Sequence, residues 1–289
     1  MPSDVNNPTA DDRPADDRPA DDRPADDLPA HDLPAHDRPA EAGTPTARAA
    51  ARARGRRRDD RRPRALVLVG RGRYEDPWHD DAATAGALQP LLAAEGWDVH
   101  VHGTSPALLA DDGLVAATVG RPDLVVVAAG TGRSDPDFDG DDAAWAAFHT
   151  ALAGFVTGGV PLLALHAAAN TFHDAPAWSG LVGGRWTDGT SWHPPIGTAT
   201  FDVADPAHPV TAGLGPVEAF DEQYCDLAVD PGSHVLLTTR HEGRDHPVVW
   251  VAPGPARVVY DGLGHDVRSW ASPSRRDLVR RTVAWLAAR

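Results

Sequence analysis

Four side chains that could move protons stand outside the apolar runs of this sequence. His166 directly follows the apolar run 161–165, His193 precedes two prolines, Glu222 lies in Asp-Glu-Gln-Tyr, and His265 lies between Gly264 and Asp266. Imidazoles titrate near neutral pH, and a carboxylate can act as a base or orient a histidine through a hydrogen bond. We therefore predict a catalytic set of His166, His193, Glu222 and His265. The alternative for each is structural, as a turn histidine or a solvated carboxylate.

Three histidines and a carboxylate could also bind zinc or another divalent metal ion. The ligands would then be His166, His193, His265 and Glu222. No short ligand spacing such as His-x-x-x-His occurs near these residues, so a divalent metal stays an open alternative and no cofactor is assigned. The glycines after the run 65–69 do not complete Gly-x-Gly-x-x-Gly, which argues against a dinucleotide.

Aromatic and polar residues near these four positions are candidates for binding a substrate. Indole rings stack on the apolar faces of sugars, and core packing is the alternative for such rings. Trp186 has this ambiguity. The predicted substrate-binding residues are Trp78, His79, Asn170, Trp192, Tyr224 and Asp266.

The elements that must position these residues alternate between strands and helices. Apolar runs predict strands at 65–69, 124–129 and 161–165, alternation predicts a strand at 97–102, and helical spacing predicts helices at 80–95 and 141–156. This order predicts an α/β fold with a parallel sheet and right-handed crossovers. Ligands of such sheets bind at the carboxyl ends of the strands, where His166 would occupy the position of a nucleophile elbow before a helix. Further strands are expected at 198–203, 234–239, 248–251 and 257–260, and a closing helix at 274–288.

The first 64 residues differ from the rest in composition. Pentapeptide repeats, which begin as Ala-Asp-Asp-Arg-Pro and drift to Ala-His-Asp-Leu-Pro and Ala-His-Asp-Arg-Pro, fill residues 10–39, and an arginine-rich block follows. Proline at every fifth position prevents a helix, and few apolar residues are available for burial. We predict a disordered tail over 1–64 and one α/β domain over 65–289.

Composition excludes several function classes. The formal charge is −15, which argues against nucleic acid as the main partner. The chain has no run of about 18 apolar residues, so no membrane span is predicted. Cys225 is the only cysteine, which fits a reducing, cytoplasmic setting. A homo-oligomer remains an open alternative.

Several phrases occur in an order that resembles the ThuA-like (trehalose utilisation) family. They are Leu165-His166-Ala167-Ala168-Ala169-Asn170, Ser191-Trp192-His193, the run from His208 to Leu214, Asp221-Glu222-Gln223-Tyr224, and the segments 247–250 and 258–266. The resemblance implies a flavodoxin-like, class I glutamine amidotransferase-like fold, with helices on both faces of the sheet, and an association with sugar metabolism.

The sequence departs from glutaminase chemistry at the elbow. Glutaminases of this fold need a cysteine thiolate there, whereas this chain has His166 and its cysteine lies far downstream. We therefore expect no glutaminase activity. The predicted function is acid–base chemistry on a sugar or keto-sugar, as an isomerase, lyase or hydrolase. The alternatives are a non-catalytic carbohydrate-binding or regulatory module, and a scaffold led by the charged tail.

Overall fold

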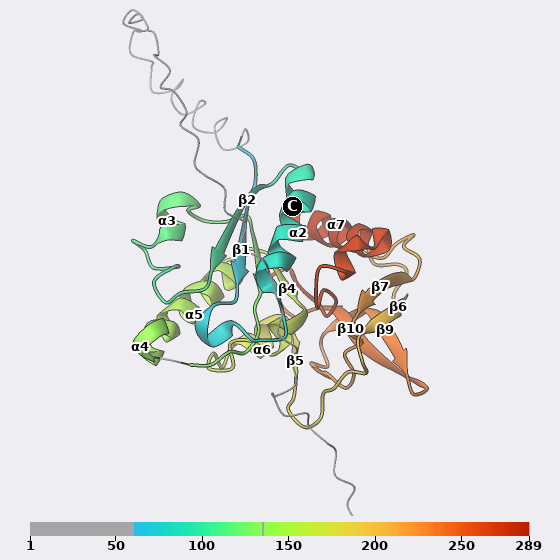
Figure 1. The fold of residues 1–289 in the computed structure, drawn as a ribbon. Helices are drawn as coiled ribbons and strands as arrows, with labels where there is room; N and C mark the ends of the chain where they lie inside the picture. The colour runs from blue at the N-terminus through green and yellow to red at the C-terminus, as the bar shows by residue number, and fades with distance from the viewer. Residues whose placement is uncertain (1–60, 135, 289) are drawn as a thin grey trace, which may run out of the picture. The chain divides into compact units, whose positions relative to one another are not determined.

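The computed structural model describes residues 61–134 and 136–288 (Figure 1). The first strand begins at Arg64, one residue before the predicted domain start. Most of the predicted tail, residues 1–60, lies outside the described residues, so its disorder stays a prediction.

One half of the central sheet is parallel. Four of its strands, β1, β3, β4 and β11, come from continuous apolar runs and are buried along nearly their whole length, whereas the edge strand β2 alternates and is partly exposed. In spatial order they are β2 (Asp98–Gly103), β1 (Arg64–Val69), β3 (Leu124–Ala128), β4 (Leu162–Leu165) and β11 (Val258–Asp261). The predicted parallel α/β sheet is therefore confirmed.

The other half of the same sheet is antiparallel, which the sequence did not indicate. It continues from β11 with β10 (Arg244–Val251), β9 (His234–His241), β6 (Gly197–Val203) and β7 (Val217–Asp221). Each neighbouring pair of strands from β11 to β7 is antiparallel, so the strand direction reverses four times and β7 runs parallel to β11. The end of β7 therefore lies at the same edge as the ends of the parallel strands. Separately, β5 (Gly184–Arg185) pairs with β8 (Ala228–Val229).

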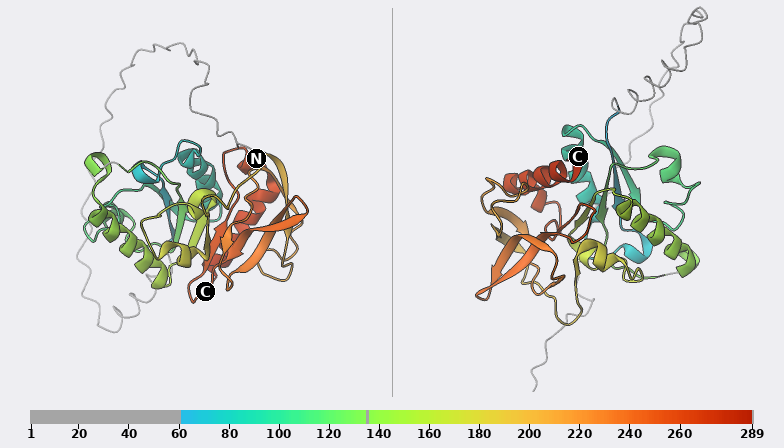
Figure 2. Two further views of the ribbon diagram at one scale, coloured as in Figure 1. Left: turned by 90° about the horizontal axis from the view of Figure 1, so that it is seen from below. Right: turned by 180° about the vertical axis from the view of Figure 1, so that it is seen from behind.

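Helices cover both faces of the sheet, as predicted (Figure 2). On one face, α2 (Asp81–Ala94) and α7 (Pro273–Ala287) pack their apolar sides on the sheet. On the other, α5 (Asp142–Thr157) packs with the short helices α3 (Leu114–Thr118) and α6 (Trp178–Val182). The remaining short elements are η1 (Gly72–Tyr74), α4 (Pro136–Asp139), η2 (His166–Ala169) and η3 (Ser269–Ala271). No helix among residues 61–134 and 136–288 is both long and apolar enough to cross a bilayer.

The helix expected directly after His166 does not form. The chain makes only the short 3-10 helix η2, and His166 has a φ of 43°, in the left-handed region. The carbonyl oxygens of Ala168 and Ala169 accept hydrogen bonds from the Trp178 indole and the Trp186 amide. These tertiary donors replace the amides that would have continued a helix, and the next α-helix begins only at Trp178.

Candidate active site

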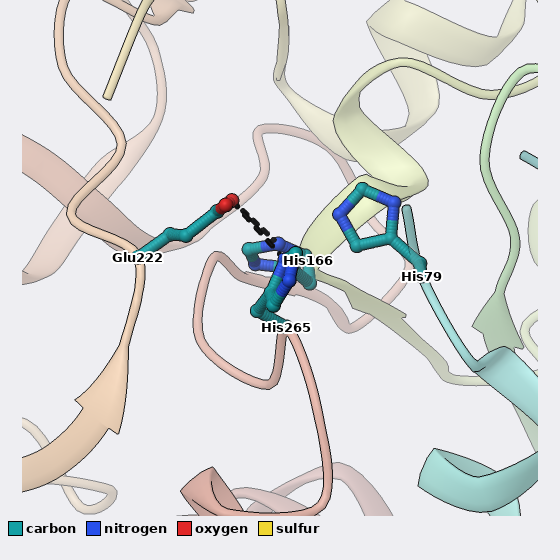
Figure 3. Close-up of side chains that lie close together, drawn as sticks. All are labelled: His79, His166, Glu222 and His265. Atoms are coloured by element: carbon teal, nitrogen blue, oxygen red, sulfur yellow. Dashed lines mark ion pairs between the residues drawn. The ribbon is translucent and has the colours of Figure 1, made fainter. Parts of the chain in front are cut away.

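Four side chains meet at the carboxyl edge of the sheet, each supplied by a different strand ending (Figure 3). His166 follows β4, His265 lies in the loop after β11, and Glu222 follows β7. His79 lies between β1 and α2. Glu222 comes from the antiparallel half, and it reaches this edge because β7 runs parallel to β11.

The donor atoms of His79, His166, Glu222 and His265 all lie within 4.8 Å of one another. Glu222 Oε2 is 3.4 Å from His166 Nε2 and 3.3 Å from His265 Nδ1. The His79 ring centroid is 4.9 Å from that of His166 and 4.7 Å from that of His265. The four side chains therefore form one compact group, called here the His/Glu cluster.

Asp76 holds the His79 ring. The Nδ1 atom of His79 is 2.8 Å from both carboxylate oxygens of Asp76, and Oδ1 also accepts from the backbone amides of Trp78 and His79. A Cβ on Gly130 would lie 1.9 Å from Asp76 Oδ2, so only glycine leaves room for this carboxylate. Because Asp76 accepts at Nδ1, the Nε2 atom of His79 is free to carry a lone pair.

His166 is oriented in a similar way. Its Nδ1 lies 2.8 Å from the carbonyl oxygen of Gly262, which can only accept, so Nδ1 carries the proton. Nε2 is then an acceptor, and the Tyr224 hydroxyl donates to it at 2.8 Å. The Tyr260 hydroxyl donates to the backbone carbonyl of His166, at the residue with the left-handed φ. These bonds fix both the tautomer and the backbone of His166.

Asp221 ties two members of the cluster together. Its Oδ1 accepts from the amides of Glu222 at 3.0 Å and His265 at 3.1 Å. Its Oδ2 accepts from the Gly264 amide at 2.8 Å and from the Ser269 hydroxyl. Gly264 has a φ of 112°, which favours glycine in this turn. A single buried carboxylate thus aligns the end of β7 with the loop after β11.

The charges of the cluster are strongly coupled. Burial alone would raise the pKa of the Glu222 carboxyl, but the nearby imidazoles of His166 and His265 lower it well below its ordinary value. Burial opposes the charged form of His265, yet its contact with Glu222 raises the pKa of that imidazole. Burial lowers the pKa of His79, partly offset by Asp76. Burial raises the pKa of Tyr224, so its hydroxyl stays protonated as a donor.

Two nitrogen atoms of the cluster are buried without a hydrogen bond. Among the described residues, His79 Nε2 and His265 Nδ1 have no hydrogen-bond partner. Leaving a buried polar atom unpaired costs about 1–3 kcal/mol, so such atoms call for an explanation. Three imidazoles and one carboxylate, with two imidazoles oriented by an acceptor behind them, match the donor set of a divalent metal site. These residues therefore fit a metal ion.

Three of the four predicted catalytic residues lie in the His/Glu cluster, and His79 replaces His193 among the candidate metal ligands. His166, Glu222 and His265 lie in the cluster, whereas His193 lies outside it, with Nδ1 3.5 Å from Glu222 Oε1. His79, predicted as a substrate-binding residue, takes its place. His193 is 39% exposed, so it faces solvent across Glu222 from the other histidines.

The predicted substrate-binding residues divide into two groups. Tyr224 touches the cluster, Trp78 adjoins it in sequence and is 72% exposed, and Asn170 lines a neighbouring cavity. Trp192 donates to Asp226 and packs on His241, and no described contact joins its ring to the cluster. Asp266 pairs with Arg268, and its charge also raises the pKa of His265.

Sequence reasoning missed two supporting carboxylates, Asp76 and Asp221. Asp76 lies three residues before His79, and Asp221 directly precedes Glu222, so proximity to the candidate residues was the available signal. Cys225 is buried, and its thiol lies 3.3 Å from the Gln223 carbonyl. The elbow position carries His166, as the sequence indicated.

Fold and site together define a class of protein: an α/β protein with a glutamine amidotransferase-like fold and a histidine–glutamate cluster in place of the elbow cysteine. The ThuA family model, described as trehalose utilisation, matches residues 64–286. The chain belongs to this family.

Solved structures support the same fold. A ThuA-like protein from Parabacteroides merdae is 19% identical with a TM-score of 0.63, covering 79% of this chain and 91% of its own. A ThuA-like protein from Bacteroides uniformis is 15% identical with a TM-score of 0.58, covering 79% and 92%. A glutamine amidotransferase from Thermotoga maritima is 8% identical with a TM-score of 0.50, covering 79% and 100%. No curated protein matched the chain.

Proposed function

We propose that this protein is a metal-dependent enzyme that acts on a sugar or keto-sugar by acid–base chemistry, as an isomerase, lyase or hydrolase. The observation that carries the proposal is the His/Glu cluster, in which the buried His79 Nε2 and His265 Nδ1 atoms have no hydrogen bond among the described residues and the latter faces Glu222. The family description, trehalose utilisation, supports a carbohydrate as the substrate class. The absence of an elbow cysteine argues against glutaminase chemistry.

In this proposal His79, His166, His265 and Glu222 hold one divalent ion. The Asp76 carboxylate and the Gly262 carbonyl, which accept from His79 and His166, raise the basicity of these ligands and fix their rings. A bound ion would polarise a substrate carbonyl or hydroxyl. Only small side-chain rotations would bring the four donor atoms, now within 4.8 Å of one another, around one ion, and an ion of coordination number five or six would keep a position open for substrate.

Residues beside the cluster would move protons and hold the sugar. His193 is half-exposed and contacts the second oxygen of Glu222, so it can exchange a proton with solvent or substrate. Tyr224 stays protonated, and once His166 Nε2 binds the ion the Tyr224 hydroxyl can turn from that nitrogen and donate to a substrate oxygen. Trp78, exposed next to His79, offers an aromatic face for a sugar ring.

We also propose that the protein works in the cytoplasm. Its only cysteine is a buried free thiol, which a reducing compartment preserves. A neighbour of similar fold from Salmonella typhimurium is described as a cytoplasmic protein, at 12% identity.

The test is metal content of the purified full-length chain after zinc loading and gel filtration. We expect about one zinc per chain, and a loss of at least tenfold in affinity in H79A and E222Q. The matched control is H234A, which removes a histidine whose Nε2 lies 2.7 Å from Asp205, away from the cluster. Substoichiometric zinc in the unaltered protein, or zinc retained in both variants, would refute the metal site.

A panel of sugars and keto-sugars then separates catalysis from binding. Turnover that H193A and E222Q reduce at least 100-fold is expected for an enzyme. Ligand binding by calorimetry with no turnover would instead support the non-catalytic carbohydrate-binding alternative.

A further inference from the structure

A cavity lies beside the His/Glu cluster. Its volume is about 300 Å³, and its polar lining includes Asn170, His173, Ser179 and Arg185. Trp186 also lines it and forms the wall toward the cluster: its ring centroid lies 4.9 Å from Tyr224 and 6.2 Å from His193. A ligand of sugar size could therefore contact both Tyr224 and this cavity across the Trp186 ring.

The polar side chains of this cavity offer hydrogen-bond donors that no protein acceptor uses. Within residues 61–134 and 136–288, the side chains of Arg185, His173 and Asn170 make no hydrogen bond or ion pair with the protein, and all three residues are exposed, so a ligand from solvent can reach them. By contrast, Arg73 contacts three aspartates, and the buried Arg275 pairs with Asp261. A guanidinium in a cavity normally binds a carboxylate or a phosphate through two parallel hydrogen bonds.

The lining of this cavity contains no carboxylate. The chain from residue 65 onward has 28 acidic residues and 14 arginines, yet none of the acidic residues lines the cavity. A small concave surface with a cation and no anion concentrates positive potential, and it favours an anionic ligand over a neutral one.

We infer that this cavity is an anion subsite, so that the substrate is an acidic sugar carrying a carboxylate or phosphate. Arg185 binds the anionic group with help from Asn170 and His173, while the sugar ring passes over Trp186 toward Tyr224 and His193. The inference rests on the proposed function for the reacting end of the substrate. It adds the charge class of that substrate.

The test compares matched sugars by calorimetry on the full-length chain. Glucose is the neutral probe, gluconate the carboxylate probe, glucose 6-phosphate the phosphate probe, and inorganic phosphate the anion alone. Measurements in chelator remove binding of these anions to a metal. The variants are R185Q and the matched control R121Q, which removes the same charge at a residue that contacts Gly158.

We expect at least one acidic sugar to bind tenfold or more tightly than glucose in the unaltered protein and in R121Q. R185Q should reduce that preference to less than threefold, and R185K should restore part of it. Gluconate or glucose 6-phosphate as the tighter ligand identifies a carboxylate or a phosphate as the group bound. Equal binding of neutral and acidic sugars, no detectable binding of any anion at millimolar concentration, or a preference retained in R185Q overturns the inference.

The two proposals fail separately. Zinc bound at one per chain, without an anion preference, would leave the metal enzyme standing and remove the anion subsite. Binding of an acidic sugar through Arg185 in a chain that takes up no zinc would support the anion subsite and refute the metal-dependent enzyme.

Discussion

Replacing Asp221 with asparagine tests how the two halves of the site are joined. Asparagine has nearly the same shape, but it puts an NH₂ group where one carboxylate oxygen stands. Each oxygen of Asp221 accepts two hydrogen bonds, so either orientation of the amide deprives two donors of their acceptor. If the NH₂ group replaces Oδ1, the amides of Glu222 and His265 lose their acceptor. If it replaces Oδ2, the Gly264 amide and the Ser269 hydroxyl lose theirs.

The magnitude follows from burial. Asp221 is 1% exposed, so the abandoned donors cannot turn to water. Each buried unsatisfied donor costs about 1–3 kcal/mol, and the Ser269 hydroxyl can rotate to reduce its share. We expect D221N to lower the free energy of unfolding by about 2–4 kcal/mol, a large part of the 5–15 kcal/mol typical of a domain. Misplacing Glu222 and His265 should also weaken zinc binding about 10- to 100-fold.

Two assays separate these effects. Urea unfolding in chelator measures the change in the free energy of unfolding, and competition of the protein with a zinc-binding dye measures the change in zinc affinity. D230N is the matched control, because no described residue donates a hydrogen bond to the Asp230 carboxylate. The reasoning is refuted if D221N unfolds within about 0.5 kcal/mol of the unaltered protein, or if its zinc affinity stays within twofold.

Three further predictions concern single side chains. D76N should weaken zinc binding about 10- to 100-fold in the dye assay, because His79 loses its orienting carboxylate; unchanged affinity would contradict this role. D261N leaves the buried Arg275 charge unpaired and should cost about 3–5 kcal/mol in urea unfolding, against less than 1 kcal/mol if the pair were unimportant. Burial raises the pKa of Cys225 from 9.0 to about 11, so its thiolate fraction at pH 8 falls about 100-fold. This thiol therefore favours the folded state below pH 9, and that contribution is lost as the pH rises through 11. Its reaction with a disulfide reagent should be slow until urea is added, and rapid labelling of the folded chain would disprove the burial effect.

Much of the fold could be predicted because the parallel strands are continuous apolar runs. Residues 124–128 are such a run, and α5 has a clear apolar stripe and an aspartate cap at Asp141. The antiparallel half was harder to interpret. Strand β7 was missed because its five residues, Val-Glu-Ala-Phe-Asp, carry only a short alternation that pairing with β6 completes.

The site could be predicted in part for a similar reason. His166, Glu222 and His265 lie at or just beyond the ends of strands, and this position places them at the same edge of the sheet. Placing His79 among the metal-ligand candidates required knowing that Asp76 turns its ring inward, and placing His193 outside required knowing the path of the loop before β6. Both depend on tertiary contacts that a single sequence does not reveal. The helix expected after His166 failed because Trp178 and Trp186 compete for its carbonyl groups.

The supply of Glu222 by the edge strand β7 has a consequence for how the protein folds. The four cluster residues come from segments spread along nearly the whole domain, and closing such long loops makes folding slow. A partly folded chain with only the parallel half formed would carry His79, His166 and His265, but it would lack the Glu222 carboxylate and the Asp221 contact that positions His265. Zinc would then bind tightly only after the last strand docks, and it would act by slowing unfolding of the finished domain. The ion would thus preserve a fold that it has no part in initiating.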